Sequence, residues 1–216
     1  MDIHENQPVR RFGAPVQDAS IAMIMLHGRG ASAGDIAALA EVLPSDGCAF
    51  AAPEASGNTW YPHSFLMPRR RNEPYLSSAL ATIDGLVQEF ERAGLAAERI
   101  LLLGFSQGAC LTAEYAARTP RRYAGVLALA GGLVGDRIDP AEYTGLLEGT
   151  PVFLGCSDQD PYIPQSRVEE TAGVLQQLQA EVTMVLYPGL PHTVNDDEIE
   201  HVRAIMHRAA RAKEAQ

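Results

Sequence analysis

The sequence predicts an α/β fold with a mostly parallel, doubly wound sheet flanked by helices, on the strength of two observations. Short apolar segments recur along the chain, and most are continuous rather than alternating, which is typical of strands buried on both faces of a parallel sheet. Helical patterns lie between them, so strands and helices alternate throughout. The expected strands span residues 22–26, 48–52, 100–103, 125–130, 152–154 and 183–186.

The expected helices follow from apolar residues at spacings of three and four. The first spans residues 35–43, and the second carries an apolar stripe over residues 76–90. Ser166 and Glu169 have the spacing of a capping box, which predicts the start of a third helix. Its inward residues would be Val168, Ala172, Leu175 and Leu178. The last helix is expected to begin near Asn195, where acidic residues suit the positive end of the helix dipole.

A chain of 216 residues suits one α/β domain with a sizeable core and is short for two. No repeat, linker or low-complexity segment divides it, so we expect a single domain over residues 1–216. One long irregular stretch, at about residues 53–74, is interpreted as a flap-like loop beside the active site. Loops of that length in compact domains are usually functional or disordered.

The composition excludes several classes of partner. The formal net charge is −10, which argues against binding to nucleic acid or to anionic membranes. No secretory signal is expected, and the longest weakly polar stretch, residues 124–135, is too short for stable membrane insertion. Cys48, Cys110 and Cys156 match neither a disulfide framework nor zinc spacing. We therefore expect a reduced, cytoplasmic location and no metal, while the oligomeric state is not readable from the sequence.

The motif with the clearest chemistry is Gly-Phe-Ser-Gln-Gly at residues 104–108, directly after the expected strand 100–103. A helical segment follows at once, which is the setting of a serine nucleophile on a sharp strand-to-helix turn. Such a turn brings backbone segments almost into contact, and glycine fits because it has no Cβ. We therefore predict that Ser106 is the nucleophile. The alternative is a glycine-rich turn with a surface serine.

A serine hydroxyl needs a neighbouring base, and on this kind of fold the base follows the nucleophile in the chain. His201 and His207 fall in the last expected helix, among solvent-facing charges, and are interpreted as surface residues. His192 lies in a loop between the last expected strand and that helix. We therefore predict that His192 is the base.

The orienting acid is expected in the loop after strand 152–154, which holds Asp158 and Asp160. Pro161 biases Asp160 towards an extended conformation that suits a side chain reaching out of a tight turn. We favour Asp160 as the acid and Asp158 as a residue that caps the turn.

Stabilising the oxyanion requires two backbone N–H groups near the nucleophile. One is expected from Gln107, the residue after Ser106. The other is expected from Arg29, in the glycine-containing loop that follows strand 22–26. His27 belongs to the same loop and is interpreted as structural.

With these residues assigned, nearly the whole chain resembles the phospholipase/carboxylesterase family of serine hydrolases, which includes acyl-protein thioesterases and is related to the dienelactone hydrolases. The segments that carry the resemblance are His27-Gly-Arg-Gly30, Trp60-Tyr61, Gly104 to Ala109, Asp158 to Pro161 and Gly189 to His192. The resemblance implies an α/β-hydrolase fold, Asp160 as the acid, and no metal or organic cofactor. Dienelactone hydrolases use a cysteine nucleophile, whereas this motif holds Ser106; Cys110 is expected to be a buried packing residue.

The sequence thus predicts an enzyme, a carboxylesterase- or phospholipase-type serine hydrolase acting on a small-molecule ester through an acyl-enzyme on Ser106. Thioester hydrolysis or acyl transfer by the same triad is an alternative, and so is a hydrolase-fold binding protein without catalysis. The stretch between the second strand and the nucleophile differs from that of eukaryotic acyl-protein thioesterases. Candidate substrate-binding residues come from the flap-like loop: Trp60, Tyr61, Phe65, Leu66 and Met67. Residues Arg69 to Arg71 either meet an acidic substrate group or form a solvated charge run.

Overall fold

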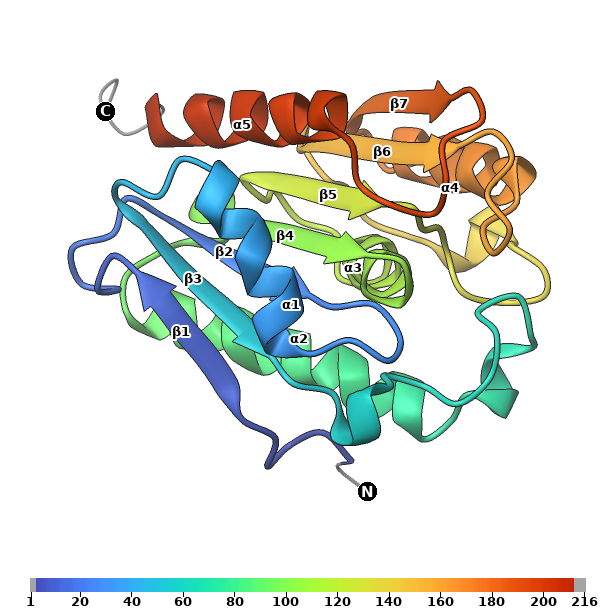
Figure 1. Ribbon diagram of the computed structural model, residues 1–216, viewed down its shortest axis with the longest axis horizontal. Coiled ribbons are helices and arrows are strands. Elements are labelled where there is room, and N and C mark those ends of the chain that lie inside the picture. The colour runs from blue at the N-terminus through green and yellow to red at the C-terminus, as the bar shows by residue number, and fades with distance from the viewer. Residues whose placement is uncertain (1–2, 212–216) are drawn as a thin grey trace.

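The computed structural model describes residues 3–211, which form a seven-stranded sheet with helices on both faces (Figure 1). The strand order is β1-β3-β2-β4-β5-β6-β7, with β1 antiparallel to β3 and the other neighbours parallel. The α/β fold predicted from the sequence is confirmed. The strands are β1 (Val9–Gly13), β2 (Ile21–Leu26), β3 (Cys48–Pro53), β4 (Ile100–Phe105), β5 (Gly125–Leu129), β6 (Pro151–Ser157) and β7 (Glu181–Tyr187).

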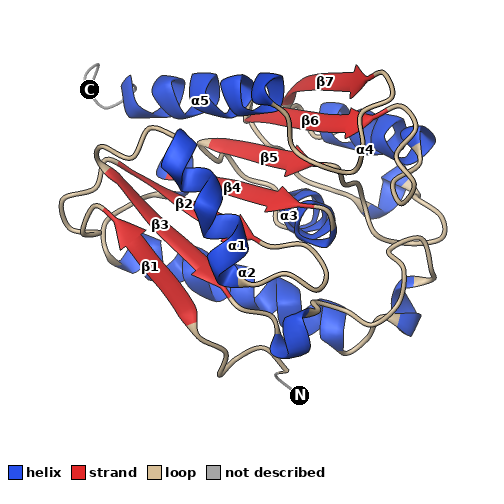
Figure 2. Ribbon diagram, in the orientation of Figure 1, coloured by secondary structure: helices blue, strands red, loops and turns tan. Residues whose placement is uncertain are grey.

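Two helices cover one face of the sheet and three cover the other (Figure 2). The first face carries α1 (Ala33–Ala37) and α5 (Asp196–Arg211). The second carries α2 (Tyr75–Arg92), α3 (Gln107–Arg118) and α4 (Gln165–Gln177). The sheet therefore separates two apolar cores, and β2 to β6 are largely buried because both of their faces are covered. None of the described helices is both long and apolar enough to span a bilayer.

The sequence analysis missed β1. This strand lies at the edge of the sheet, pairs with β3 alone, and leaves Arg10 and Arg11 exposed. Charged side chains are common on edge strands because they oppose pairing with another chain. The apolar run that reveals a buried strand is therefore absent at this edge.

Two helix starts also differ from expectation. The expected helix 35–43 divides into α1 and a 3₁₀ turn over Ala38–Val42. The predicted capping box at Ser166 is wrong, because α4 begins at Gln165 after Pro164 and has no side-chain cap. A reciprocal pair of this kind instead opens α5, where the Glu198 backbone N–H donates to Asn195 Oδ1 and the Asn195 N–H donates to Glu198 Oε2, each at 2.9 Å. The expected inward residues of α4 are buried.

Candidate active site

Ser106 lies between β4, at the centre of the sheet, and α3. Its φ of 54° and ψ of −117° place a non-glycine residue in a strained backbone conformation. The flanking glycines permit this turn: a Cβ at Gly104 would lie 2.3 Å from the carbonyl carbon of Gly108, and one at Gly108 would lie 2.1 Å from the oxygen of Leu26. The turn holds the serine hydroxyl at the end of the sheet where the parallel strands terminate.

The loops after β6 and β7 bring Asp160 and His192 to Ser106. His192 Nε2 lies 2.9 Å from Ser106 Oγ, and His192 Nδ1 lies 2.6 Å from Asp160 Oδ2. The side chain of Asp160 is 1% exposed, and its Oδ1 also accepts the backbone N–H groups of Tyr162 and Ile163. A carboxylate only accepts hydrogen bonds, so the Nδ1–H of a neutral His192 donates to Asp160, and Nε2 is left as the acceptor that faces the Ser106 hydroxyl.

Asp158 is bound differently from Asp160. Its Oδ1 accepts the backbone N–H of Gly189 at 2.8 Å. Gly189 belongs to the loop that carries His192, so Asp158 links the loop after β6 to the loop after β7. It stabilises this pair of loops without contacting the imidazole.

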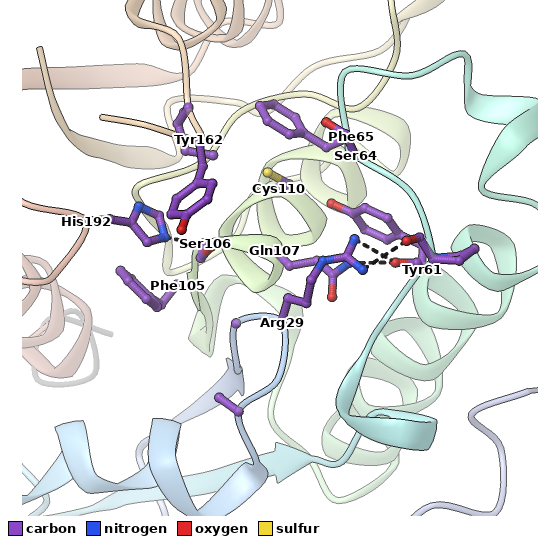
Figure 3. A pocket seen from close by; sticks show the side chains of 14 residues that line it. Arg29, Tyr61, Ser64, Phe65, Phe105, Ser106, Gln107, Cys110, Tyr162 and His192 are labelled. Atoms are coloured by element: carbon purple, nitrogen blue, oxygen red, sulfur yellow. Dashed lines mark hydrogen bonds between the residues drawn. The ribbon is translucent and has the colours of Figure 1, made fainter. Parts of the chain in front are cut away.

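The loop after β2 approaches Ser106 closely, because a Cβ at Gly28 would lie 3.3 Å from the Ser106 Cβ. Figure 3 shows Arg29 and Gln107 beside Ser106. Within residues 3–211, the backbone N–H groups of both residues donate no hydrogen bond. Gln107 is also the first residue of α3, where N–H groups lack intrahelical acceptors and the helix dipole favours negative charge.

The side chains of the same two residues hold the segment 60–63 of the flap-like loop (Figure 3). The Arg29 guanidinium donates to the carbonyl oxygens of Tyr61, Pro62 and His63 at 2.9, 3.0 and 2.8 Å. Gln107 Nε2 donates to the Tyr61 oxygen at 2.8 Å, and Gln107 Oε1 accepts the Trp60 N–H at 2.9 Å. The sequence analysis missed these roles, because nothing in the order of residues indicates which backbone groups an Arg or Gln side chain will reach.

Ser106 and His192 open onto a cavity of about 590 Å³. Two of the five predicted substrate-binding residues, Tyr61 and Phe65, line it, whereas Trp60, Leu66 and Met67 do not. Trp60 is completely buried between the rings of His4 and His27, and its Nε1–H donates to the His27 oxygen. Trp60 therefore belongs to the core that supports the loop. The sequence-based prediction for Trp60 was wrong because a large aromatic residue in a loop can either line a pocket or pack into a core.

His27 and His4 are both buried, and burial lowers the pKa of each imidazole. His27 Nε2 accepts the N–H of Ala55, and His4 Nδ1 accepts the N–H of Ser56, each at 3.0 Å. Both rings are consequently neutral and fasten the start of the flap-like loop to the domain.

Tyr162 also lines the cavity. The sequence analysis did not identify this residue, and the one feature that could have indicated it is its closeness to Asp160 in the chain. The residue is 66% exposed, and its ring meets His192 edge-on at a centroid distance of 4.9 Å. Phe105 packs against the same imidazole at 5.0 Å. The imidazole thus contacts one aromatic ring from the end of β4 and another from the loop after β6.

The three arginines at residues 69–71 have different environments. As a group they therefore match neither alternative from the sequence, which were contact with an acidic substrate group and a solvated charge run. Arg69 forms ion pairs with the fully buried Glu114 of α3 and with Glu142, and its Nε donates to the Val134 oxygen at 2.8 Å. It does not line the cavity with Ser106. Arg69 therefore fastens the far end of the flap-like loop to the domain, while Arg70 and Arg71 lie closer to solvent.

No cluster of three His, Cys, Asp or Glu side chains in the described part of the chain is arranged to hold a metal ion. Cys48, Cys110 and Cys156 are buried and free, and burial raises the pKa of each thiol to about 12.

Known proteins share this architecture. A crystal structure of a phospholipase/carboxylesterase from Dyadobacter fermentans superposes with a TM-score of 0.92 at 45% identity, covering 96% of this chain and 99% of that one. Acyl-protein thioesterase 1 of Kluyveromyces lactis is 27% identical, over 92% of this chain and 96% of that protein. The alignment with acyl-protein thioesterase 1 of Gibberella zeae spans 53% of that protein. A putative carboxymethylenebutenolidase of Salmonella typhi is 35% identical over 56% of this chain and 46% of its own length.

The sheet topology and these neighbours define an α/β-hydrolase. The model of the phospholipase/carboxylesterase family matches residues 12–208. The chain therefore belongs to the phospholipase/carboxylesterase family and is an enzyme of the esterase and thioesterase class.

Proposed function

We propose that this enzyme hydrolyses carboxylic esters of small molecules through an acyl-enzyme on Ser106. The observation that carries the proposal is the continuous contact from Ser106 Oγ through the His192 imidazole to Asp160, at 2.9 and 2.6 Å. Catalytic base and nucleophile must lie within hydrogen-bond reach, and here they do so before any substrate binds.

In the proposed mechanism, His192 Nε2 takes the proton of Ser106 as Oγ attacks the carbonyl carbon of the ester. Asp160 holds the imidazole in the required tautomer and stabilises the imidazolium that forms. The same Nε2 then donates its proton to the leaving alcohol, and the acyl group remains on Ser106. Water, deprotonated by His192 Nε2, then attacks the acyl carbon, the bond to Ser106 Oγ breaks, and Nε2 returns the proton to Oγ as the acid is released.

The backbone N–H groups of Arg29 and Gln107 are proposed to bind the tetrahedral oxyanion. Their lack of acceptors within the described residues supports this role. A preorganised donor of this type contributes about 3 kcal/mol to transition-state stabilisation. The start of α3 adds a favourable dipole at the same point.

Hydrolysis of thioesters by the same residues is the second candidate, because several relatives are named acyl-protein thioesterases. The chemistry differs in the leaving group alone, so substrate assays separate the two. Esters and thioesters of one acid, compared at equal concentration, give the ratio directly.

Turnover of p-nitrophenyl esters of increasing acyl length, together with labelling by an organophosphorus fluoride, tests the proposal. Wild type should hydrolyse the esters and gain one covalent adduct, whereas Ser106→Ala should lose both. Ser77→Ala, exposed on α2, is the matched control and should retain both. Undiminished turnover in Ser106→Ala would overturn the assignment of the nucleophile, and wild type without turnover or adduct would favour a binding protein.

A further inference from the structure

The phenol group of Tyr61 is buried beside the active-site cavity without a hydrogen-bond partner. The residue is 1% exposed, and its hydroxyl oxygen has no partner among the described residues. The polar group beside it is the Cys110 thiol, with which the hydroxyl can form no more than a weak hydrogen bond, so its capacity to donate to an oxygen is unused. A buried hydroxyl in this state costs free energy relative to a phenylalanine of the same shape.

The backbone that carries this side chain is held by two residues of the site. The Tyr61 carbonyl accepts hydrogen bonds from both Arg29 and Gln107, at 2.9 and 2.8 Å. These bonds hold the backbone at Tyr61, and the ring itself is packed into the cavity wall, with 1% of the residue exposed. In Figure 3 the Tyr61 hydroxyl points towards Cys110 and the side of the cavity that Phe65 bounds.

The chemistry at Ser106 decides which part of an ester reaches this side. His192 must protonate the leaving alcohol, so the alcohol lies near His192. The acyl chain then extends away from the imidazole. Figure 3 shows His192 and Phe105 on one side of Ser106, and Tyr61, Phe65 and Cys110 on the other. The acyl chain is thus directed towards Tyr61.

The rest of this side offers little for a polar acyl group. Phe65 is apolar, and the Arg29 guanidinium and Gln107 amide are already bonded to the flap-like loop; the Ser64 hydroxyl, which accepts the Leu66 N–H, is exposed to solvent. Cys110 lies one helical turn from Ser106, which corresponds to about 6 Å along the helix axis. A donor beside Cys110 therefore suits an oxygen a few bonds from the scissile carbonyl.

We infer, on the basis of the proposed esterase activity, that the acyl group of the preferred substrate carries a second oxygen acceptor at carbon 4 or 5, and that the Tyr61 hydroxyl donates to it. Tyr61 is in this view a specificity-determining residue. Sites that hydrogen-bond a substrate group discriminate strongly against analogues without that group, because the protein donor is then left unpaired.

Two pairs of shape-matched esters test this inference. The p-nitrophenyl esters of 4-oxopentanoate and 5-oxohexanoate are compared with those of 4-methylpentanoate and 5-methylhexanoate. Wild type should favour the ketone in at least one pair by about tenfold in kcat/KM. Tyr61→Phe should reduce that ratio to about one or below. Equal rates within both pairs for wild type, or an unchanged ratio in Tyr61→Phe, would overturn the inference.

Tyr115→Phe is the matched control. The Tyr115 hydroxyl is on α3, outside the cavity, and donates to Asp84 at 2.9 Å. Tyr115→Phe should keep the ketone preference and lower Tm, whereas Tyr61→Phe should change Tm little, because its hydroxyl has only the weak contact with the Cys110 thiol to lose. A lower Tm with an unchanged ratio in Tyr61→Phe would instead assign the hydroxyl a structural role. Ser106→Ala, run in parallel, shows separately whether the proposed ester chemistry holds.

Discussion

The side-chain amide of Gln107 donates to the backbone oxygen of Tyr61 at 2.8 Å. The residue that follows Ser106 therefore holds the opposite wall of the cavity, 46 positions away in the chain. The Arg29 guanidinium donates to the same oxygen at 2.9 Å. Because the backbone N–H groups of both residues are the proposed oxyanion donors, these donors and the substrate-binding loop form one connected unit.

Gln107→Met is expected to disturb this unit while leaving the backbone N–H at position 107 in place. The change leaves the Trp60 N–H without a partner in a buried setting, at a cost of about 1–3 kcal/mol, and removes one of the two hydrogen bonds to the Tyr61 oxygen, which keeps its bond to Arg29. We expect a lower free energy of unfolding and a loss of about tenfold or more in kcat/KM. Urea denaturation and ester kinetics measure the two effects. Gln176→Met, exposed on α4, is the control, and unchanged kinetics in Gln107→Met would argue against the coupling.

Asp160→Asn and Asp158→Asn should have very different effects on activity. In Asp160→Asn, the new side-chain amide would present a donor to His192 or force the wrong tautomer, and a change of this type costs about 10⁴ in kcat in a serine protease triad. Asp158→Asn retains an oxygen that can accept the Gly189 N–H, so we expect a loss below about tenfold. Steady-state kinetics on one ester compares them. A larger loss at Asp158 would exchange the two roles.

Much of the fold could be predicted because a strand buried on both faces needs apolar residues throughout. The strands β2 to β6 have such continuous apolar runs because helices cover both of their faces. β1 could not be recognised in this way, since one edge strand with exposed Arg10 and Arg11 has no such run. The start of α4 was also misjudged, because the Ser166–Glu169 spacing fits a capping box that the backbone after Pro164 does not form.

The residues of the candidate site also fall into a group that could be predicted from the sequence and a group that could not. Ser106, Asp160 and His192 could be selected from sequence because each follows a strand, and the ends of parallel strands meet at one edge of the sheet. The side-chain partners of Gln107, Arg29 and Arg69 could not be predicted from the sequence, because they depend on the path of an irregular loop. The same path buries Trp60 and leaves Tyr61 against the cavity, although the two are adjacent aromatic residues.

Two glycine-to-alanine changes should act in opposite directions. A Cβ at Gly108 would overlap the Leu26 oxygen at 2.1 Å, so Gly108→Ala should displace the turn at Ser106 and abolish activity. Gly85 is exposed within α2 and a Cβ there meets nothing within 4 Å. Gly85→Ala should therefore raise the free energy of unfolding by about 0.5–1 kcal/mol with kinetics unchanged. Activity retained in Gly108→Ala would contradict the close packing at this turn.

Glu198 should make the stability of the fold depend on pH. Its side chain is fully buried, and burial, with a smaller contribution from Asp197, raises its pKa from 4.5 to about 7. The folded state thus binds this proton more tightly than the unfolded state. The stabilisation is fully present below pH 4.5 and is lost as the pH rises through about 7.

Glu198→Gln removes this titration and keeps an oxygen that can accept the Asn195 N–H. The variant should resemble wild type at pH 5 and exceed it by about 2–3 kcal/mol at pH 9, where wild type carries a buried carboxylate. Urea denaturation at pH 5, 7 and 9 measures the difference. Glu200→Gln, exposed on the same helix, controls for the loss of one negative charge. Glu198 Oε1 lies against Gly155 without a hydrogen-bond partner among the described residues. If Glu198→Gln is no more stable than wild type at pH 9, the buried carboxylate must be stabilised by an interaction that the structure does not show.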